Sequence, residues 1–104
     1  MKTFTAVILD QDGTIREVEY AEKDSYRTMS AAVGGLIESV DWMGFGMDAY
    51  ANEEGLYTPG LSVNPHAARV YPKHQRILGN IVLPKMTPTK RARLIKKGFA
   101  VNPE

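Results

Sequence analysis

Cationic side chains that could bind phosphate or carboxylate groups crowd the last third of the chain. Nine Lys and Arg residues lie within 29 positions, with Tyr71 and Phe99 beside them. They are Arg69, Lys73, Arg76, Lys85, Lys90, Arg91, Arg93, Lys96 and Lys97. Clustered cations bind nucleic-acid phosphates because neutralising the phosphates releases counterions. We expect a macromolecule-binding surface made by Arg69, Lys73, Arg76, Lys90, Arg91, Arg93 and Lys97.

The net charge of +1 conceals an asymmetry along the chain. Residues 1–65 carry four Lys/Arg and eleven Asp/Glu, a balance of −7, whereas residues 66–104 carry nine and one, a balance of +8. Two interpretations stay open. The halves fold together and partly neutralise each other, with the C-terminal cations paired to Glu17, Glu19 or Glu38, or the basic side chains face an acidic partner. No helix-turn-helix, zinc-finger or aromatic ribonucleoprotein motif accompanies the cations.

Two carboxylates follow an apolar run near the N-terminus, in the segment AVILDQDGTI of residues 6–15. This segment resembles the nucleophile motif of haloacid-dehalogenase-type phosphatases. The resemblance implies that Asp10 would attack phosphorus and bind magnesium, while Asp12 would act as general acid and base. That chemistry also needs a downstream cation and a further acidic pair that completes the magnesium site.

The rest of the chain does not supply this phosphatase site. Lys85 or Lys90 could be the cation, but Glu104 is the only acidic residue after Glu54. The Asp-Gly pair inside the motif is also a favoured pair for a tight hairpin turn. We therefore expect a hairpin and no catalytic residues. A magnesium-dependent phosphoryl-transfer enzyme that uses the two aspartates is the distant alternative.

Metal, cofactor and membrane chemistry also lack a sequence signal. His66 and His74 have no carboxylate nearby in sequence, and the glycine spacing matches no dinucleotide fingerprint. The chain has no cysteine, which excludes disulfides and thiolate sites and agrees with a reducing cytoplasm. No apolar run approaches the roughly 20 residues that span a bilayer, and the N-terminus turns polar too early for a secretory signal. We expect no metal, no cofactor and no membrane partner.

Hydrophobic patterns in the first third predict a hairpin and a helix within a single domain of residues 1–104. Thr3–Leu9 and residues 15–20 read as two strands joined by the Asp-Gly turn. The apolar phase slips between Ile15 and Val18, which a bulge would explain. A helix opens with Asp24 or Ser25 as its cap, and a Gly-Gly pair ends it.

The middle of the chain predicts a second hairpin and a short helix. A strand that alternates from Val40 and a strand over residues 47–52 flank a Gly-containing link. Asn64 followed by Pro65 is the sharpest helix start in the chain, because Asn caps well and Pro at the first helical position loses no hydrogen bond.

Three segments of this region, LIESVD, ANEEGL and GLSVNPHA, resemble a small domain family of unknown function from actinobacteria and their phages. The resemblance covers roughly the middle two thirds of the chain. It implies a phage or mobile-element protein that works in a bacterial cytoplasm, and it assigns no catalytic residue.

The last third predicts one more strand and the basic helix. Residues 77–83 suit a final strand or a tight hairpin. Thr87-Pro88 repeats the cap-then-Pro signal and starts a helix of about residues 88–97. Ala92 and Ile95, with Leu94 as a further candidate, face inward, and Gly98 ends the helix.

Together these patterns predict an α+β domain with an antiparallel sheet, an N-terminal hairpin and two to three helices on one face. We expect a small non-enzymatic phage-type protein that binds a host macromolecule, with a protein or protein complex favoured as the partner. A nucleic-acid-binding module that uses the basic C-terminal helix is the alternative.

Overall fold

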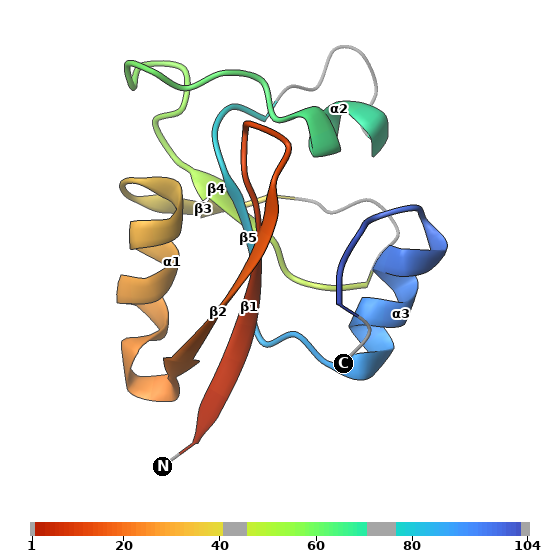
Figure 1. Ribbon diagram of the computed structural model, residues 1–104. Coiled ribbons are helices and arrows are strands. Elements are labelled where there is room, and N and C mark those ends of the chain that lie inside the picture. The colour runs from red at the N-terminus through yellow and green to blue at the C-terminus, as the bar shows by residue number, and fades with distance from the viewer. Residues whose placement is uncertain (1, 41–45, 71–76, 103–104) are drawn as a thin grey trace.

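A five-stranded antiparallel sheet runs through the computed structural model, which describes residues 2–40, 46–70 and 77–102. In pairing order the strands are β2 (Ile15–Ala21), β1 (Thr3–Leu9), β5 (Ile81–Leu83), β4 (Tyr50–Asn52) and β3 (Ile37–Ser39). Those residues also form the helices α1 (Ser25–Val33), α2 (Pro65–Val70) and α3 (Pro88–Lys96), and the short 3-10 helix η1 (Glu22–Asp24) (Figure 1). The predicted α+β class, antiparallel sheet and N-terminal hairpin are confirmed.

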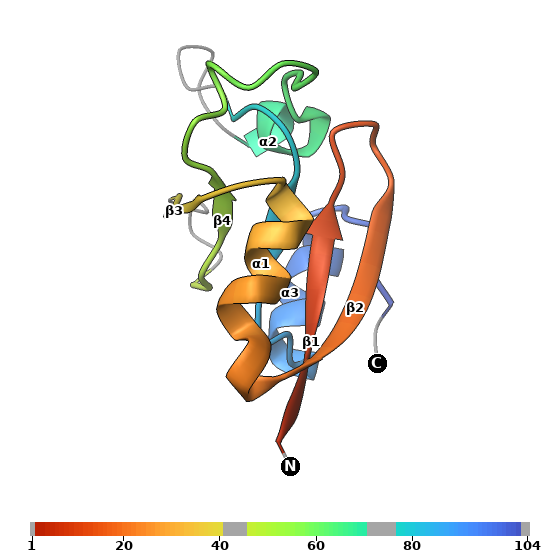
Figure 2. The ribbon, with the colours of Figure 1, turned by 90° about the vertical axis from the view of Figure 1, so that its left-hand side faces the viewer.

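The helices cover both faces of the sheet, not one face as the sequence suggested. Ala6 and Ile8 of β1 belong to a core cluster that includes the α1 residue Val33. Val7 and Leu9 belong to a second cluster, with Leu94 of α3. Figures 1 and 2 show α1 and α3 on opposite sides of the strands. A run of apolar residues without alternation fits a central strand buried on both faces.

This two-sided burial also explains the phase slip in β2, where a bulge was the prediction. The register between β1 and β2 is continuous from the Thr3–Ala21 pair to the Leu9–Ile15 pair, so the bulge prediction is wrong. Ile15 packs against the α3-side cluster, and Val18 packs against the α1-side cluster. Because successive side chains point to opposite faces, an odd spacing between two apolar residues serves two cores at once.

The ends of α1 follow the predicted boundaries with one difference. Asp24 occupies the N-cap position, but its side chain makes no capping hydrogen bond. Ser25 donates its hydroxyl to the carbonyl of Glu22 instead, so neither predicted residue caps with its side chain. Gly34 ends the helix at φ 79°, a left-handed conformation that glycine adopts without a Cβ clash.

The second hairpin and the last strand are shorter than the sequence suggested. β3 pairs antiparallel with β4 and starts at Ile37, before the predicted Val40, whose backbone N–H still donates to Ala49. The rest of that predicted strand, residues 41 and 42, lies outside the described residues. The last strand described is β5, which covers Ile81–Leu83. The alternative hairpin within residues 77–83 is not formed, because Leu78 pairs with Val63 and not with a residue of β5.

The inward face of α3 includes Leu94, as the sequence suggested, but differs from the prediction at its other positions. Arg91 and Leu94 are its buried residues, three positions apart on one side of the helix. Ala92 is exposed and Ile95 is 40% exposed. The hydrophobic pattern predicted the wrong face because Arg91, which forms an ion pair with Glu17, occupies a buried position.

Candidate functional site

Asn64 positions α2 at one end of the sheet and is completely buried. Its side-chain oxygen accepts hydrogen bonds from the backbone N–H groups of His66 at 2.9 Å and Ala67 at 3.4 Å, so the predicted cap is confirmed. Its side-chain nitrogen donates to the carbonyls of Leu9 and Gly79, both at 2.8 Å. One amide therefore joins the start of α2 to the end of β1 and to the segment that leads into β5.

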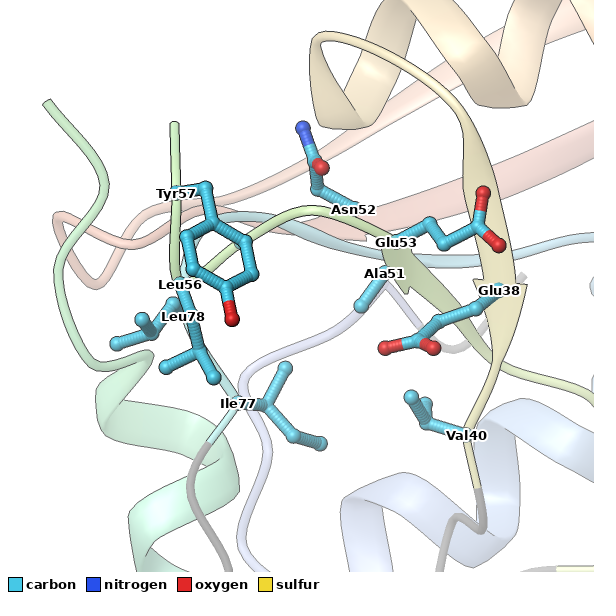
Figure 3. A pocket seen from close by; sticks show the side chains of 10 residues that line it. Glu38, Val40, Ala51, Asn52, Glu53, Leu56, Tyr57, Ile77 and Leu78 are labelled. Carbon is cyan, nitrogen blue, oxygen red and sulfur yellow. The ribbon is translucent and has the colours of Figure 1, made fainter. Parts of the chain in front are cut away.

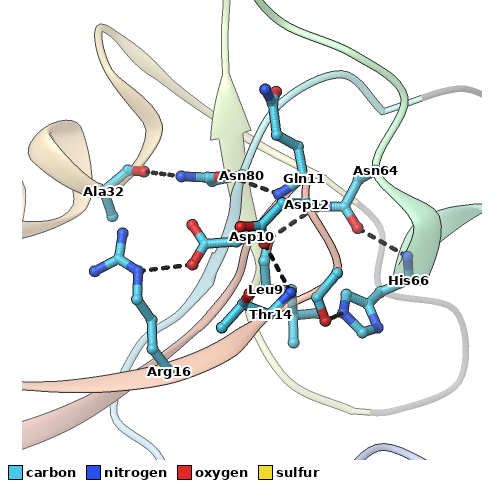
Figure 4. Close-up of polar contacts among 11 residues, drawn as sticks. Leu9, Asp10, Gln11, Asp12, Thr14, Arg16, Ala32, Asn64, His66 and Asn80 are labelled. Carbon is cyan, nitrogen blue, oxygen red and sulfur yellow. Dashed lines mark hydrogen bonds and ion pairs between the residues drawn. The ribbon is translucent and has the colours of Figure 1, made fainter.

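A polar junction surrounds the same end of the sheet (Figure 4). Asn80 accepts a hydrogen bond from the backbone of Gln11 at 2.9 Å and donates to the carbonyl of Ala32 at 3.0 Å, which links the β1–β2 turn to α1. The Gln11 side chain donates to the Gly60 carbonyl and accepts from the Ser62 backbone N–H. The turn is thus held by long-range contacts with two other parts of the chain.

Asp10 and Asp12 lie in this turn, and the expected hairpin is confirmed. Asp10 forms an ion pair with Arg16 at 2.8 Å, and its backbone closes the turn with Gly13 and Thr14. Asp12 accepts a hydrogen bond from the Thr14 backbone N–H at 2.8 Å, which lowers the pKa of the Asp12 carboxyl. Both carboxylates therefore have roles in the local turn geometry.

His66 is buried between the β1–β2 turn and Phe99, which follows α3. Its Nε2 lies 2.9 Å from the Gly13 carbonyl oxygen, and its ring centroid lies 5.7 Å from that of Phe99. Its Nδ1 is buried without a hydrogen-bond partner. Because a carbonyl oxygen can only accept, the contact places a proton on Nε2, and the ring packs between the turn and Phe99. His74 lies outside the described residues.

The helix α3 presents most, but not all, of its basic residues toward solvent. Thr87 caps it by accepting a hydrogen bond from the Lys90 backbone N–H at 3.2 Å, with Pro88 at the first position as predicted. Lys90, Arg93, Lys96 and Lys97, which we call the basic strip, follow one side of the helix and its C-terminus, at spacings of three and four residues. Arg93, Lys96 and Lys97 are exposed and Lys90 is half-buried.

Arg69 of α2 extends the basic strip at its C-terminal end. Its guanidinium carbon lies 5.0 Å from the centroid of the Phe99 ring, and it donates to the carbonyl of Lys97 at 3.4 Å. A cation over an aromatic face is attracted by the ring quadrupole. Phe99 is only 3% exposed and packs into the core. Of the remaining predicted binding residues, Lys73 and Arg76 lie outside the described residues.

Arg91 is the one described binding residue that the structure removes from the surface. It is 4% exposed and forms two hydrogen bonds with the Glu17 carboxylate, at 2.7 and 2.8 Å, and one with the Asn102 carbonyl at 2.9 Å. These contacts lower the pKa of the Glu17 carboxyl and raise the pKa of Arg91. Glu17 lies opposite Val7 on the α3 side of the sheet, which brings the two charges together. Arg91 was predicted to lie on an exposed binding surface, and this prediction is wrong because the residue is buried.

A groove that sequence reasoning missed lies over β3 and β4, with a volume of about 220 Å³ (Figure 3). Val40, Ala51, Ile77 and Leu78 form its apolar lining, and Glu38, Glu53, Leu56 and Tyr57 stand around it. Leu56 and Tyr57 are 80% and 84% exposed. Two consecutive large apolar residues inside an otherwise polar turn were the sequence signal for this feature.

Metal-ligand clusters and membrane-spanning helices are both absent from the described residues. Across residues 2–40, 46–70 and 77–102 we find no group of three or more His, Cys, Asp or Glu side chains arranged to hold a metal ion. None of the helices in these ranges has the length and apolar character needed to cross a membrane.

Comparison with known proteins gives a family and no closer relative. No curated protein and no solved structure matches the chain. The family model described as "Domain of unknown function (DUF3846)" matches residues 1–93, which include both hairpins, α1, α2 and most of α3. The expected membership of an uncharacterised domain family is thus confirmed, and the chain belongs to the DUF3846 family.

Proposed function

We propose that this protein is a small non-enzymatic module that uses its basic strip and Arg69 to bind an acidic surface of a host macromolecule, with a protein partner favoured. The proposal includes a phage-type protein acting in the cytoplasm of a bacterial host. Support for this setting comes from the resemblance of the segments LIESVD, ANEEGL and GLSVNPHA to a family of actinobacteria and their phages, and from the lack of cysteine.

The observation that carries the proposal is the charge layout of α3. The helix PTKRARLIK contains no acidic residue, and its basic strip faces solvent while the fifth nearby cation, Arg91, is neutralised inside the fold by Glu17. Arg69 adds another exposed cation from α2. A concentration of one sign of charge on one side of a small domain attracts and orients an oppositely charged partner.

The alternative, a nucleic-acid-binding module, uses the same cations. Binding of single strands commonly adds aromatic side chains on which bases stack. Among the described residues, Phe99 is an aromatic residue close to the basic strip. Its side chain is buried, and the exposed Arg69 lies over its ring. This arrangement offers no stacking surface at Phe99 and favours a protein partner.

The non-enzymatic part of the proposal rests on the β1–β2 turn. Asp10 is paired with Arg16, and Asp12 holds the Thr14 backbone N–H. The strand after these residues continues directly into an antiparallel hairpin. The distant phosphatase alternative would require these carboxylates to leave their turn contacts and bind magnesium.

Affinity capture from a bacterial lysate tests the proposal with matched variants. Immobilised wild-type protein, Lys96→Gln/Lys97→Gln and the control Lys23→Gln/Arg27→Gln are compared before and after nuclease treatment. The control removes the same charge from exposed residues of η1 and α1. The proposal expects a protein that wild type and control retain after nuclease and that the Lys96/Lys97 variant loses. Retention that disappears with nuclease supports the nucleic-acid alternative, and equal retention by all three contradicts both.

A further inference from the structure

We propose that the groove over β3 and β4 binds a Lys or Arg side chain from an extended, basic segment of a partner protein. This site goes beyond the proposed function, because it lies on another part of the molecule and selects the opposite charge. Neither the family match nor the charge pattern of the sequence gives a role to the residues of this groove.

The size of the groove fits a single side chain. Its volume is about 220 Å³, whereas small-molecule and cofactor sites start at roughly 300 Å³. The apolar lining of Val40, Ile77 and Leu78 would contact the aliphatic stem of such a side chain. Long cationic side chains commonly bury their stems on apolar surface while their charged heads reach polar groups.

The polar groups around the groove include two carboxylates, those of Glu38 and Glu53. Figure 3 shows the Glu38 carboxylate and the Tyr57 hydroxyl directed into the hollow, with the Glu53 carboxylate beside β3. Among the described residues neither glutamate forms an ion pair. A cationic head could therefore pair with Glu38 without breaking an existing contact there, whereas an Asp or Glu side chain would be repelled.

The backbone of β3 suits an extended partner segment. The Val40 N–H donates to the Ala49 carbonyl at 2.9 Å, and the Glu53 N–H donates to the Leu36 carbonyl at 2.8 Å. In an antiparallel ladder this spacing turns the N–H and C=O groups of Ile37 and Ser39 away from β4. Within the described part of the chain no strand pairs with that side of β3. An added strand there would place alternate side chains next to Glu38.

The exposed apolar pair supplies contacts beside the pocket. Leu56 and Tyr57 stand at the groove and are the most exposed large apolar residues described. Large apolar side chains gathered at one exposed place mark interaction surfaces. They would pack against apolar residues that flank the cationic side chain of the partner.

Selection from a displayed random dodecapeptide library over the immobilised full chain tests the proposal. We expect enriched sequences in which Lys or Arg is flanked by apolar residues. Their binding, measured by fluorescence polarisation, should weaken roughly tenfold or more in Glu38→Gln and in Tyr57→Ala. The control Glu54→Gln removes an exposed neighbouring carboxylate outside the groove and should bind like wild type. Glu38→Lys should switch the selection toward peptides that carry Asp or Glu.

Contrary outcomes are equally concrete. A selection that enriches no sequence, enriches acidic ones, or enriches peptides whose binding survives both groove variants overturns the proposal. Light scattering that shows a dimer lost on Glu38→Gln would assign the groove to a second copy of this chain and also overturn it. Thermal melts establish that the variants are folded, and amide shifts of Ala51, Gly55 and Ile77 on peptide addition locate the binding.

Discussion

Replacement of Asn64 by alanine should cost far more stability than the loss of an ordinary helix cap. The cap itself contributes about 1 kcal/mol. The substitution also removes two buried hydrogen bonds, from the Asn64 amide to the carbonyls of Leu9 and Gly79, both at 2.8 Å. Each lost hydrogen bond costs about 1 kcal/mol. The expected total is about 3 kcal/mol, which lowers the melting temperature of a domain this size by roughly 15 °C.

Two matched variants separate the contributions at Asn64. Thr87→Ala removes a cap whose side chain, within the described residues, bonds only to the Lys90 backbone N–H, so it should cost about 1 kcal/mol. Asn64→Ser keeps a capping oxygen but has no amide donor for the two carbonyls. Its loss of unfolding free energy should be about 2 kcal/mol, between the losses in Thr87→Ala and Asn64→Ala. Equilibrium urea unfolding measures all three. If Asn64→Ala costs no more than Thr87→Ala, the bonds from Asn64 to β1 and to the segment before β5 contribute nothing, and the account of how α2 is held is wrong.

Three further predictions concern the buried ion pair and the turn. Glu17→Gln should destabilise the fold more than Arg91→Met. The first substitution leaves a 5% exposed guanidinium with a weakened partner, whereas the second leaves a carboxylate that is 30% exposed to water. Urea unfolding measures both losses of stability, and a larger loss in Arg91→Met would contradict this explanation. Because Arg91 holds the pKa of Glu17 below its ordinary 4.5, the stability from this pair is complete above pH 4.5 and is lost as the pH falls through the folded pKa; stability measured through this acid range should fall less steeply in Glu17→Gln. Purified protein should show no magnesium-dependent hydrolysis of a generic phosphate ester, and activity that disappears in Asp10→Asn would revive the phosphatase interpretation.

Local signals predicted the parts of the fold that local chemistry determines. Asn64 before Pro65 and Thr87 before Pro88 located two helix starts, because a cap and a missing N–H act within one turn. Gly98, at φ 92°, follows the end of α3 as expected. The Asp-Gly pair marked the first hairpin, since its turn is closed by neighbouring residues.

Features that depend on distant partners were not predictable in the same way. The charge of Arg91 suggested an exposed binding residue, but Glu17, which is 74 positions away, makes it a core residue. The spacing of Ile15 and Val18 suggested a bulge because an odd spacing breaks the alternation of a strand buried on one face, whereas this sheet is covered on both faces. The groove joins Glu38 to Leu78 through three separate segments, so its existence follows from the topology and not from any one stretch.

One affinity comparison decides whether the basic strip binds an acidic partner. The protein captured from lysate after nuclease treatment is titrated with wild type, Lys96→Gln/Lys97→Gln and Lys23→Gln/Arg27→Gln at low and high salt. We predict roughly tenfold weaker binding for the Lys96/Lys97 variant at low salt, a smaller difference at high salt, and wild-type affinity for the control. Equal affinities of the Lys96/Lys97 variant and the control at low salt would contradict the claim.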